Sequence, residues 1–316
     1  MARRRASGVR GTEPPDRPAR RHGMTVWAAI AAHIAAETGT RFAPATPQSV
    51  GGGCINTTVR LADGRQSWFV KVNAASMLDM FEAERAGLQQ LASADAIRVP
   101  RPLAVGSEGA QSWLVLEDIR FGQPGPGSAR DAGRRLAALH RTTAPAFGWS
   151  RDNTIGATPQ PNAWAASWLE FWRDRRLGHQ LQLAARSGYG RRLQDLGHRL
   201  LERLPALLSH APAPSLLHGD LWGGNIGYTT GGEPVIYDPA VYYGDREADL
   251  AMTELFGGFG DEFYAGYREA WPLDAGYPTR KVLYNLYHVL NHLNLFGGGY
   301  GAQAEAMMGR LLAEVG

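Results

Sequence analysis

Short stretches of alternating apolar and polar residues mark the first third of the chain. Residues 58–61 and 68–72 alternate in this way, and the turn sequence Asp63-Gly64 separates them, so they predict two successive strands. Residues 77–92 carry apolar positions three and four apart, which predicts a helix. This part of the chain therefore combines strands with one helix.

Breaks that are rich in proline and glycine divide the rest of the chain. Residues 99–102 contain two prolines and precede the apolar run 113–116, which predicts a buried strand. After the glycine- and proline-rich stretch 122–127 the pattern is mainly helical, with short apolar strands predicted at residues 216–218 and 235–237. A β-rich N-terminal part is thus followed by a larger, mainly helical part.

The composition of the 316 residues is that of a globular protein. Apolar residues make up 44% and charged residues 20%, which excludes a fibrous or wholly disordered chain. No run of about 18 apolar residues occurs, so we expect no membrane-spanning helix and no membrane partner. The single cysteine, Cys54, excludes an intrachain disulfide and a cysteine-based zinc site, and it favours a reducing cytoplasm.

The basic charge of the chain is concentrated at its start. Residues 1–23 carry seven arginines against one glutamate and one aspartate, and they are rich in proline and glycine, so we expect a disordered tail. The remainder is slightly acidic, which gives no electrostatic reason to expect nucleic-acid binding. Residues 24–36 are apolar as in a signal peptide, but His33 and Glu37 interrupt that pattern, and an amphipathic helix fits better.

Lys71 is one of only two lysines in a chain that otherwise uses arginine. It lies in the strand that follows the glycine-rich turn at residues 51–56. On the next helix, Glu84 shares a stripe with Phe81 and Leu88, and an inward-facing carboxylate is costly unless it is paired. A strand lysine paired with a helix glutamate behind a glycine-rich loop is the arrangement with which kinases hold ATP phosphates.

A second motif follows the apolar run at residues 216–218. Asp220 enters a loop and Asn225 follows five residues later, which is the spacing of a kinase catalytic loop, where the aspartate is the base and the asparagine binds Mg²⁺. Asp238 ends another apolar strand thirteen residues beyond Asn225. Since Mg²⁺ requires hard oxygen ligands, Asp238 is the expected second ligand.

Other chemistries use some of these residues. Asp220 and Asp238 could form the carboxylate pair of a glycoside hydrolase, but that hypothesis leaves Lys71, Glu84 and the glycine-rich turn unexplained. His288 and His292 are four apart and could share a helix face as zinc ligands. That segment lacks the glutamate of the His-Glu-x-x-His motif and a third ligand, so pocket or core histidines are favoured.

With these motifs in place, the chain resembles the fructosamine kinase (ketosamine 3-kinase) family, a branch of the aminoglycoside phosphotransferase-like kinases. The resemblance covers about residues 25–312. The segments that carry it are residues 51–56, 69–72, 80–84, 216–225, 237–252, 256–259 and 284–297. The resemblance implies a bilobal, α+β, protein-kinase-like fold. After the tail of residues 1–23, a small β-rich N-lobe spans residues 24–118 and a larger, mainly helical C-lobe spans residues 119–316.

The reaction implied by the resemblance is ATP-dependent phosphorylation of the 3-hydroxyl of a ketosamine, a ribulosamine or fructosamine adduct on a free or protein-bound amine. A phosphate on C3 labilises the adduct, which then decomposes and frees the amine, so such enzymes are deglycation kinases. The first alternative is an aminoglycoside or other small-alcohol phosphotransferase of the same superfamily. The second is a catalytically silent nucleotide-binding protein.

The resemblance also implies roles for individual residues. ATP would contact three regions: Lys71 with its partner Glu84, a loop that covers the phosphates, and the backbone of the hinge. The loop comprises Gly51, Gly52, Gly53, Cys54, Ile55 and Asn56. The hinge comprises Glu117, Asp118 and Ile119. Asp220 would be the base, Asn225 and Asp238 the Mg²⁺ ligands, and Asp249 a brace for the catalytic loop. The acceptor side would comprise Trp222, His288, Asn291 and His292. Trp164, Trp168 and Trp172 are four apart and are expected in the core or in a pocket wall.

Cys54 is also a candidate redox switch. It follows three glycines, and backbone N–H groups arranged for an anion would favour its thiolate. Because it is the only cysteine, oxidation could form a disulfide only between two chains. We therefore expect a Cys54-linked homodimer, inactive until reduced, under oxidising conditions, with an inert packed cysteine as the alternative.

Overall fold

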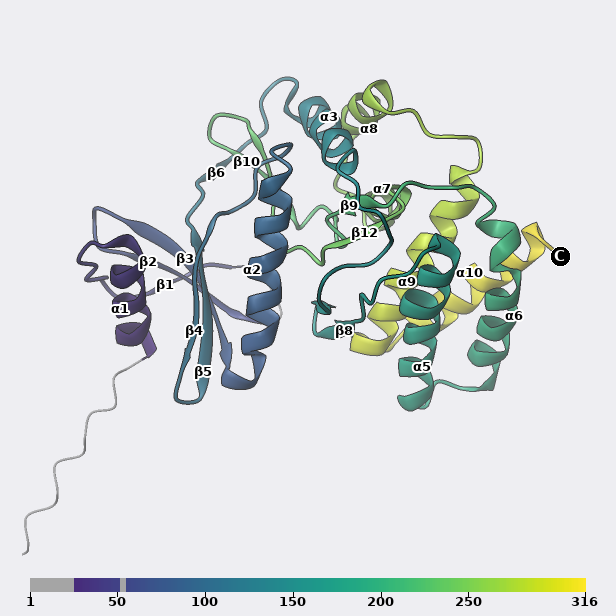
Figure 1. Cartoon of the computed structure of the whole chain (residues 1–316), viewed down its shortest axis with the longest axis horizontal. Helices are drawn as coiled ribbons and strands as arrows, with labels where there is room; N and C mark the ends of the chain where they lie inside the picture. The colour runs from purple at the N-terminus through teal and green to yellow at the C-terminus, as the bar shows by residue number, and fades with distance from the viewer. Residues whose placement is uncertain (1–25, 52–54) are drawn as a thin grey trace, which may run out of the picture.

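A five-stranded antiparallel sheet forms the N-terminal part of the molecule (Figure 1). The computed structural model describes residues 26–51 and 55–316. The strands lie in the order β1 (Gln48–Ser49), β2 (Thr57–Ala62), β3 (Ser67–Ala74), β5 (Gln111–Glu117) and β4 (Pro102–Glu108). The predicted turn between β2 and β3 is confirmed: Gly64 has a φ of +86°, and Oδ1 of Asp63 accepts hydrogen bonds from the backbone of Arg65 and Gln66.

Helices cover both faces of this sheet (Figure 1). Helix α1 (Val26–Thr38) packs on one face, where Val70 and Val72 of β3 join its core. Helix α2 (Leu78–Ser93), preceded by a 3₁₀ turn (Ala75–Met77), lies on the other face. Since side chains alternate along a strand, Lys71 lies on the face opposite to Val70 and Val72, toward α2 and the rest of the molecule.

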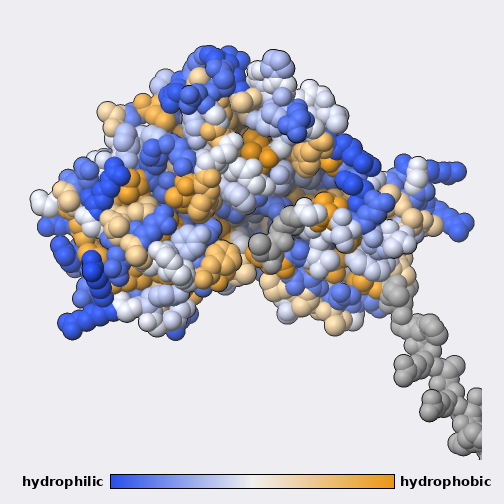
Figure 2. Space-filling view, turned by 180° about the vertical axis from the view of Figure 1, so that it is seen from behind, coloured by the Kyte–Doolittle hydropathy of each residue, from blue (hydrophilic) through white to orange (hydrophobic). Residues whose placement is uncertain are grey.

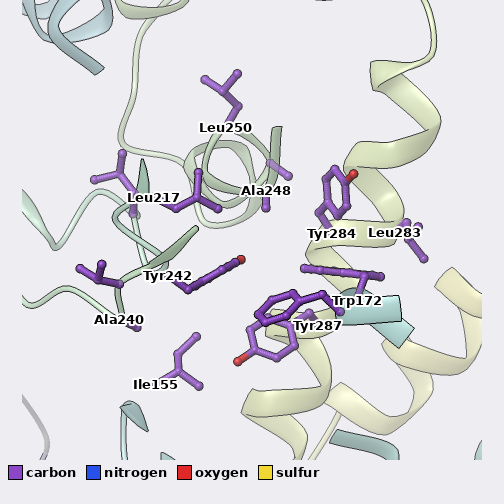
Figure 3. Close-up of a cluster of buried hydrophobic side chains, with 14 of the residues drawn as sticks. Ile155, Trp172, Leu217, Ala240, Tyr242, Ala248, Leu250, Leu283, Tyr284 and Tyr287 are labelled. Atoms are coloured by element: carbon purple, nitrogen blue, oxygen red, sulfur yellow. The ribbon is translucent and has the colours of Figure 1, made fainter. Parts of the chain in front are cut away.

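The C-terminal part is mainly helical, as predicted. Its helices are α3 (Ser128–His140), α4 (Trp168–Phe171), a π-helix (Trp172–Leu177), α5 (Gly178–Arg186), α6 (Arg191–Leu207), α7 (Glu247–Leu255), α8 (Asp261–Ala270), α9 (Tyr277–Phe296) and α10 (Tyr300–Glu314). Helix α9 is buried along most of its length. In Figure 3 its Tyr284 and Tyr287 face Trp172, with ring centroids 4.8 and 5.7 Å apart.

Short two- and three-stranded sheets connect these helices. The loops that contain Asp220 and Asp238 follow two of their strands. One sheet is β6 (Phe121–Gly122), β10 (Ile226–Thr229) and β11 (Pro234–Ile236). A second is β9 (Ser215–Leu217) with β12 (Tyr242–Gly244), and a third is β7 (Asn153–Ile155) with β8 (Thr158–Gln160). The predicted strands near residues 216–218 and 235–237 correspond to β9 and β11.

The two parts meet through the chain that leaves β5. Strand β6 follows it and pairs with β10 of the C-terminal part, and Arg98 forms ion pairs with both Glu117 (2.7 Å) and Glu233 (3.0 Å). A hollow lies between the parts and is visible in Figure 2. The expected bilobal α+β fold is confirmed.

The break predicted at residues 99–102 separates α2 from β4, and Pro102 is the first residue of β4, a position where a strand tolerates proline. Trp168 and Trp172 are buried in the core, as expected. Trp164 precedes α4 and is 48% exposed, so its expected place in the core is wrong. In the described part of the chain, no helix is long and apolar enough to cross a membrane.

Candidate active site

Lys71 joins two carboxylates from distant parts of the chain. Its Nζ atom lies 2.6 Å from Oε1 of Glu84 and 2.6 Å from Oδ1 of Asp238, and only 5% of its side chain is exposed. Burial by itself lowers the pKa of Lys71, but the charges of Asp238 and Glu84 outweigh burial and raise it above its ordinary value. Lys71 is therefore a fixed cation between the sheet and the C-terminal part.

The position of Glu84 follows from the periodicity of α2. Phe81 and Leu88, three residues before and four after it, are fully buried on the same face of the helix. This face brings the Glu84 side chain, 11% exposed, to Lys71. Burial raises the pKa of Glu84 although the Lys71 charge opposes it, so the carboxylate depends on this ion pair.

The loop after β9 is fixed by its backbone. Gly219 has a φ of +84°, and a Cβ there would collide with the carbonyl oxygen of Ala240, so only glycine fits. Asp249 of α7 accepts hydrogen bonds from the backbone N–H of His218 (2.7 Å) and Gly219 (2.8 Å), and His140 lies 3.1 Å from it. These contacts hold the two peptides that precede Asp220.

His218 continues this support. Its Nε2 donates to the carbonyl oxygen of Tyr237 (2.9 Å), and its Nδ1 accepts from the backbone N–H of Asp220 (3.3 Å). This pattern requires the neutral imidazole, and burial lowers the pKa of His218 accordingly. The ring thus connects the loop of Asp220 to the strand end that carries Asp238.

Asp220 and Asn225 contact each other within this loop. Nδ2 of Asn225 donates to the Asp220 carbonyl oxygen (2.9 Å) and lies 3.4 Å from its Oδ2. Burial, together with the charges of Asp238 and Asp249, raises the pKa of Asp220 to about 7, whereas Asn225 opposes the shift. A carboxylate with a pKa near neutrality is suited to accepting a proton.

Asp238 and Asn225 offer oxygens for a hard cation. Asp238 has a φ of +57°, a conformation that aspartate tolerates, and its Oδ1 bonds to Lys71. Among the hydrogen bonds of the described residues, none involves Oδ2 of Asp238 or Oδ1 of Asn225. A carboxylate oxygen and an amide oxygen beside Asp220 fit the ligand preference of Mg²⁺.

Two adjoining cavities open at these residues. The larger, of about 480 Å³, extends from Lys71 and Asp238 to the predicted hinge, where Glu117, Asp118 and Ile119 line it. Gly51, Ile55 and Asn56 of the predicted phosphate loop also line it. The smaller, of about 190 Å³, has Asp220 in its wall. Lys71, Asn225, Asp238 and Trp222 border both cavities, so the two spaces meet at the candidate catalytic residues.

The predicted acceptor-side histidines lie elsewhere. Neither His288, Asn291 nor His292 is among the described residues that line the two cavities. His288 is buried, and burial lowers its pKa to about 3, while Asn291 bonds to Gln180. His292 packs against Phe256, which in turn packs against Trp222. Of the four predicted residues, only Trp222 reaches the cavities.

The zinc hypothesis gains no support from this helix. Nδ1 of His292 donates to the carbonyl oxygen of His288, and in the described part of the chain neither histidine belongs to a group of side chains that could hold a metal. Within the described residues, the group able to hold a metal is His210, Asp245 and Glu247, and Glu247 is paired with Arg280 at 2.6 Å.

Three residues of the predicted phosphate loop, Gly52, Gly53 and Cys54, lie outside the described residues. The predicted redox role of Cys54 therefore stays a prediction.

Sequence reasoning missed several cavity residues. Arg60 of β2 lines the larger cavity and bonds through Nε to Oδ2 of Asp118 (2.7 Å). Asn153 and Thr154 line the smaller cavity from β7. The alternation of β2 places Arg60 on the face of Thr58 and could have identified it. The strands β7 and β8 have three residues each, too few for a periodic signal.

Comparison with known proteins places this site in a family. The sequence model described as "Fructosamine kinase" matches residues 26–314. The chain belongs to the fructosamine kinase family. This membership agrees with the resemblance seen in the sequence.

Individual relatives cover nearly the whole fold. A protein of Synechocystis sp. named "Probable ketoamine kinase" is 50% identical over 90% of this chain and 97% of its own length. The chloroplastic protein-ribulosamine 3-kinase of Arabidopsis thaliana is 44% identical over 82% of this chain and 80% of its length. A crystal structure of a family protein from Haemophilus somnus 129PT superposes with a TM-score of 0.84 at 32% identity, covering 92% of this chain and 98% of that one. An aminoglycoside phosphotransferase shares the fold at 15% identity, with a TM-score of 0.60 and coverage of 90% and 98%.

Proposed function

We propose that this fructosamine kinase family member transfers the γ-phosphate of ATP to the 3-hydroxyl of a ketosamine. The observation that carries the proposal is that two cavities meet at Lys71, Asn225 and Asp238, with Asp220 in the wall of the smaller one. A phosphoryl-transfer enzyme needs a nucleotide space and an acceptor space that meet at a base, a metal site and a fixed cation. A glycoside hydrolase has no use for the Lys71–Glu84 pair.

The roles that we propose combine this geometry with the resemblance to kinases. Asp220 accepts the proton of the acceptor hydroxyl, since its raised pKa matches that task. Lys71, oriented by Glu84, holds the α- and β-phosphates, and residues 51–56 cover them. The backbone of residues 117–119 faces the adenine end of the larger cavity. Asn225 and Asp238 hold Mg²⁺, which would neutralise charge on the β- and γ-phosphates.

The ketosamine is the substrate class that fits the relatives best. Two relatives that are 50% and 44% identical to this chain carry the names probable ketoamine kinase and protein-ribulosamine 3-kinase. Enolisation of the C2 ketone toward C1 lets the phosphate on C3 leave as inorganic phosphate. Water then hydrolyses the resulting imine, which frees the amine and leaves a 3-deoxy dicarbonyl sugar. A ribulosamine or fructosamine on a free or protein-bound amine is therefore the proposed acceptor, and deglycation in the cytoplasm is the proposed role.

The lobes divide this work. Residues 24–118 form the nucleotide-binding N-lobe, and residues 119–316 form the catalytic and acceptor-binding C-lobe, with the hinge at Glu117, Asp118 and Ile119. The salt bridge of Arg98 to Glu233 crosses this boundary, and the salt bridge of Arg98 to Glu117 ties Arg98 to the hinge. Because the nucleotide cavity is lined from both sides of the boundary, ATP would bind between the lobes.

A screen of ATP consumption tests the proposal. Purified protein with Mg²⁺ is offered ribuloselysine, fructoselysine or kanamycin, and the Asp220→Asn variant serves as the control for contaminating kinases. Consumption with a ketosamine alone, abolished in the variant, supports the proposal. Consumption with kanamycin alone would identify the protein as an aminoglycoside-type kinase. Nucleotide binding without consumption for any acceptor would identify a silent nucleotide-binding protein.

A further inference from the structure

One wall of the smaller cavity, which we call the β7 wall, belongs to a β-hairpin and does not border the larger cavity. Asn153, Thr154 and Gly156, from β7 and the turn that follows it, line this cavity together with Asp220 and Trp222. Thr154 is half-buried, and its hydroxyl takes part in none of the hydrogen bonds recorded for the described residues. Since Thr154 lines the same cavity as Asp220, its hydroxyl can donate to or accept from a bound acceptor.

Asn153 is held by three hydrogen bonds. Its Oδ1 accepts from Nε2 of Gln160 (2.8 Å) and from Nδ2 of Asn162 (2.9 Å), and its Nδ2 donates to the carbonyl oxygen of Val241 (2.9 Å). The acceptor capacity of the amide is therefore used within the protein. Asn153 lines the cavity but is suited to position the hairpin rather than to bind a sugar.

Asn153, Gln160 and Asn162 form an amide cluster. Buried groups on two further elements anchor this cluster. The Tyr287 hydroxyl of α9 donates to Oε1 of Gln160 (2.6 Å), and Nη2 of Arg176 donates to Oδ1 of Asn162 (2.7 Å). Figure 3 shows that the Tyr287 hydroxyl points toward Ile155 and Ala240. The hairpin is thus fixed from behind by side chains of the C-terminal core.

Arg176 is an unusual anchor. Its side chain has no exposed surface, and it forms no ion pair with a carboxylate of the described residues. Its guanidinium lies 4.0 Å from the ring centre of Tyr242 and 4.5 Å from that of Phe171, and it also donates to the carbonyl oxygen of Pro161. A buried cation without a carboxylate is costly, and here aromatic faces, a carbonyl and the Asn162 amide stabilise it.

The same cluster connects the hairpin to the candidate metal site. Gln160 donates to the carbonyl oxygen of Ala240 (3.1 Å), and Asn153 donates to that of Val241. Both carbonyls belong to the segment that begins at Asp238. The cluster therefore fixes the distance between the Thr154 wall and the residues that would hold Mg²⁺, and this distance decides where an acceptor hydroxyl meets the transferred phosphate.

We propose that the β7 wall determines acceptor specificity: the Thr154 hydroxyl hydrogen-bonds the acceptor sugar, and Asn153 is a positioning residue that keeps this wall in register with Asp238. The inference rests on the proposed kinase function and adds to it the residues that recognise the acceptor. A neutral hydrogen bond contributes about 0.5–1.5 kcal/mol, which corresponds to roughly a twofold to tenfold change in acceptor affinity. Replacement of either residue should leave KM for ATP nearly unchanged.

Steady-state kinetics of three variants test the Thr154 contact. Thr154→Val keeps the side-chain shape and removes the hydroxyl, Thr154→Ser keeps the hydroxyl, and Thr230→Val alters an exposed threonine elsewhere. We expect Thr154→Val to raise KM for the acceptor about twofold to tenfold with KM for ATP unchanged. Thr154→Ser and Thr230→Val should resemble the wild type. An unchanged acceptor KM in Thr154→Val, or an equal rise in Thr154→Ser, would overturn the contact.

Asn153→Ala tests the positioning role. We expect a higher acceptor KM and a lower kcat with KM for ATP within about twofold, because the displaced wall misaligns the hydroxyl. Proportional losses of ATP and acceptor affinity with an earlier thermal transition would reduce Asn153 to a structural residue and overturn its role.

The acceptor in both series is the one that the wild type phosphorylates among ribuloselysine, fructoselysine and kanamycin. Turnover of kanamycin alone refutes the ketosamine assignment while the variants still test the wall. If the wild type phosphorylates none of the three compounds, both the proposed function and the proposed role of the β7 wall are refuted.

Discussion

The Nζ atom of Lys71 lies 2.6 Å from Oδ1 of Asp238, although the two residues are 167 positions apart in the chain. This contact joins β3 of the N-terminal sheet to the end of β11 in the C-terminal part. Because Glu84 holds the same ammonium group, Lys71 connects α2 and the N-terminal sheet to the C-terminal part. Loss of the lysine would leave two neighbouring carboxylates without a counter-charge.

Lys71 should not tolerate conservative replacement. We expect Lys71→Ala and Lys71→Arg each to lower kcat/KM for ATP by at least about a hundredfold, because a planar guanidinium does not fit between Glu84 and Asp238. Lys281, the other lysine, pairs with Glu254 on the surface at 2.5 Å, so Lys281→Arg is the matched control and should be fully active. Normal kinetics in Lys71→Arg would show that any cation suffices at this position.

Replacement of the base should separate chemistry from binding. We expect Asp220→Asn to bind ATP with nearly the wild-type Kd and to turn over at least about a hundredfold more slowly, which is the usual scale for loss of a positioned base. Calorimetry of ATP binding and single-turnover kinetics measure the two quantities. A variant that retains turnover, once wild-type contamination is excluded, would remove Asp220 from the base role.

The raised pKa of Asp220 also predicts an effect on stability. Its folded-state pKa of about 7 exceeds the ordinary value of 3.8, so the folded protein binds more protons than the unfolded chain between pH 4 and 7. The Asp220 contribution to stability therefore falls as pH rises through this window. Asp220→Asn should raise Tm relative to wild type at pH 8, with little difference at pH 4, measured without metal or nucleotide. An equal Tm at pH 8 would indicate an ordinary pKa.

Asp249 should be required for the shape of the catalytic loop. Asp249→Ala leaves the N–H groups of His218 and Gly219 without their acceptor, and each buried unsatisfied group costs about 1–3 kcal/mol. We expect a loss of at least about 2 kcal/mol in urea unfolding. The surface variant Asp195→Ala, which removes an exposed pair with Arg191, should lose less than about 0.5 kcal/mol. Similar losses in both variants would contradict the bracing role.

Local sequence patterns accounted for much of the nucleotide side. The helical period of α2 placed Glu84 on the buried face with Phe81 and Leu88, and strand alternation placed Lys71 opposite to Val70. The five-residue spacing of Asp220 and Asn225 fixes a local loop, so both residues were found from the chain alone. These features depend on short-range geometry, which a sequence carries directly.

The acceptor side could not be predicted in the same way. The four-residue spacing of His288 and His292 identifies a helix face, but α9 is buried nearly all round, and tertiary packing decides which side chain meets which cavity. Asn153 and Thr154 belong to β7, a strand of three residues, which is too short for a periodic signal. Their place in the same cavity wall as Asp220 depends on hydrogen bonds to distant residues such as Val241, 88 positions away from Asn153.

The position of the transferred phosphate is the most direct test of the proposed function. Ribuloselysine, ATP and Mg²⁺ are incubated with the protein, and ³¹P–¹H correlation NMR identifies the carbon that bears the new phosphate. The account predicts a phosphomonoester coupled to the proton on C3, followed by release of free lysine, and no product with Asp220→Asn. Phosphate on a terminal hydroxyl, or no phosphorylated ketosamine at all, would contradict it.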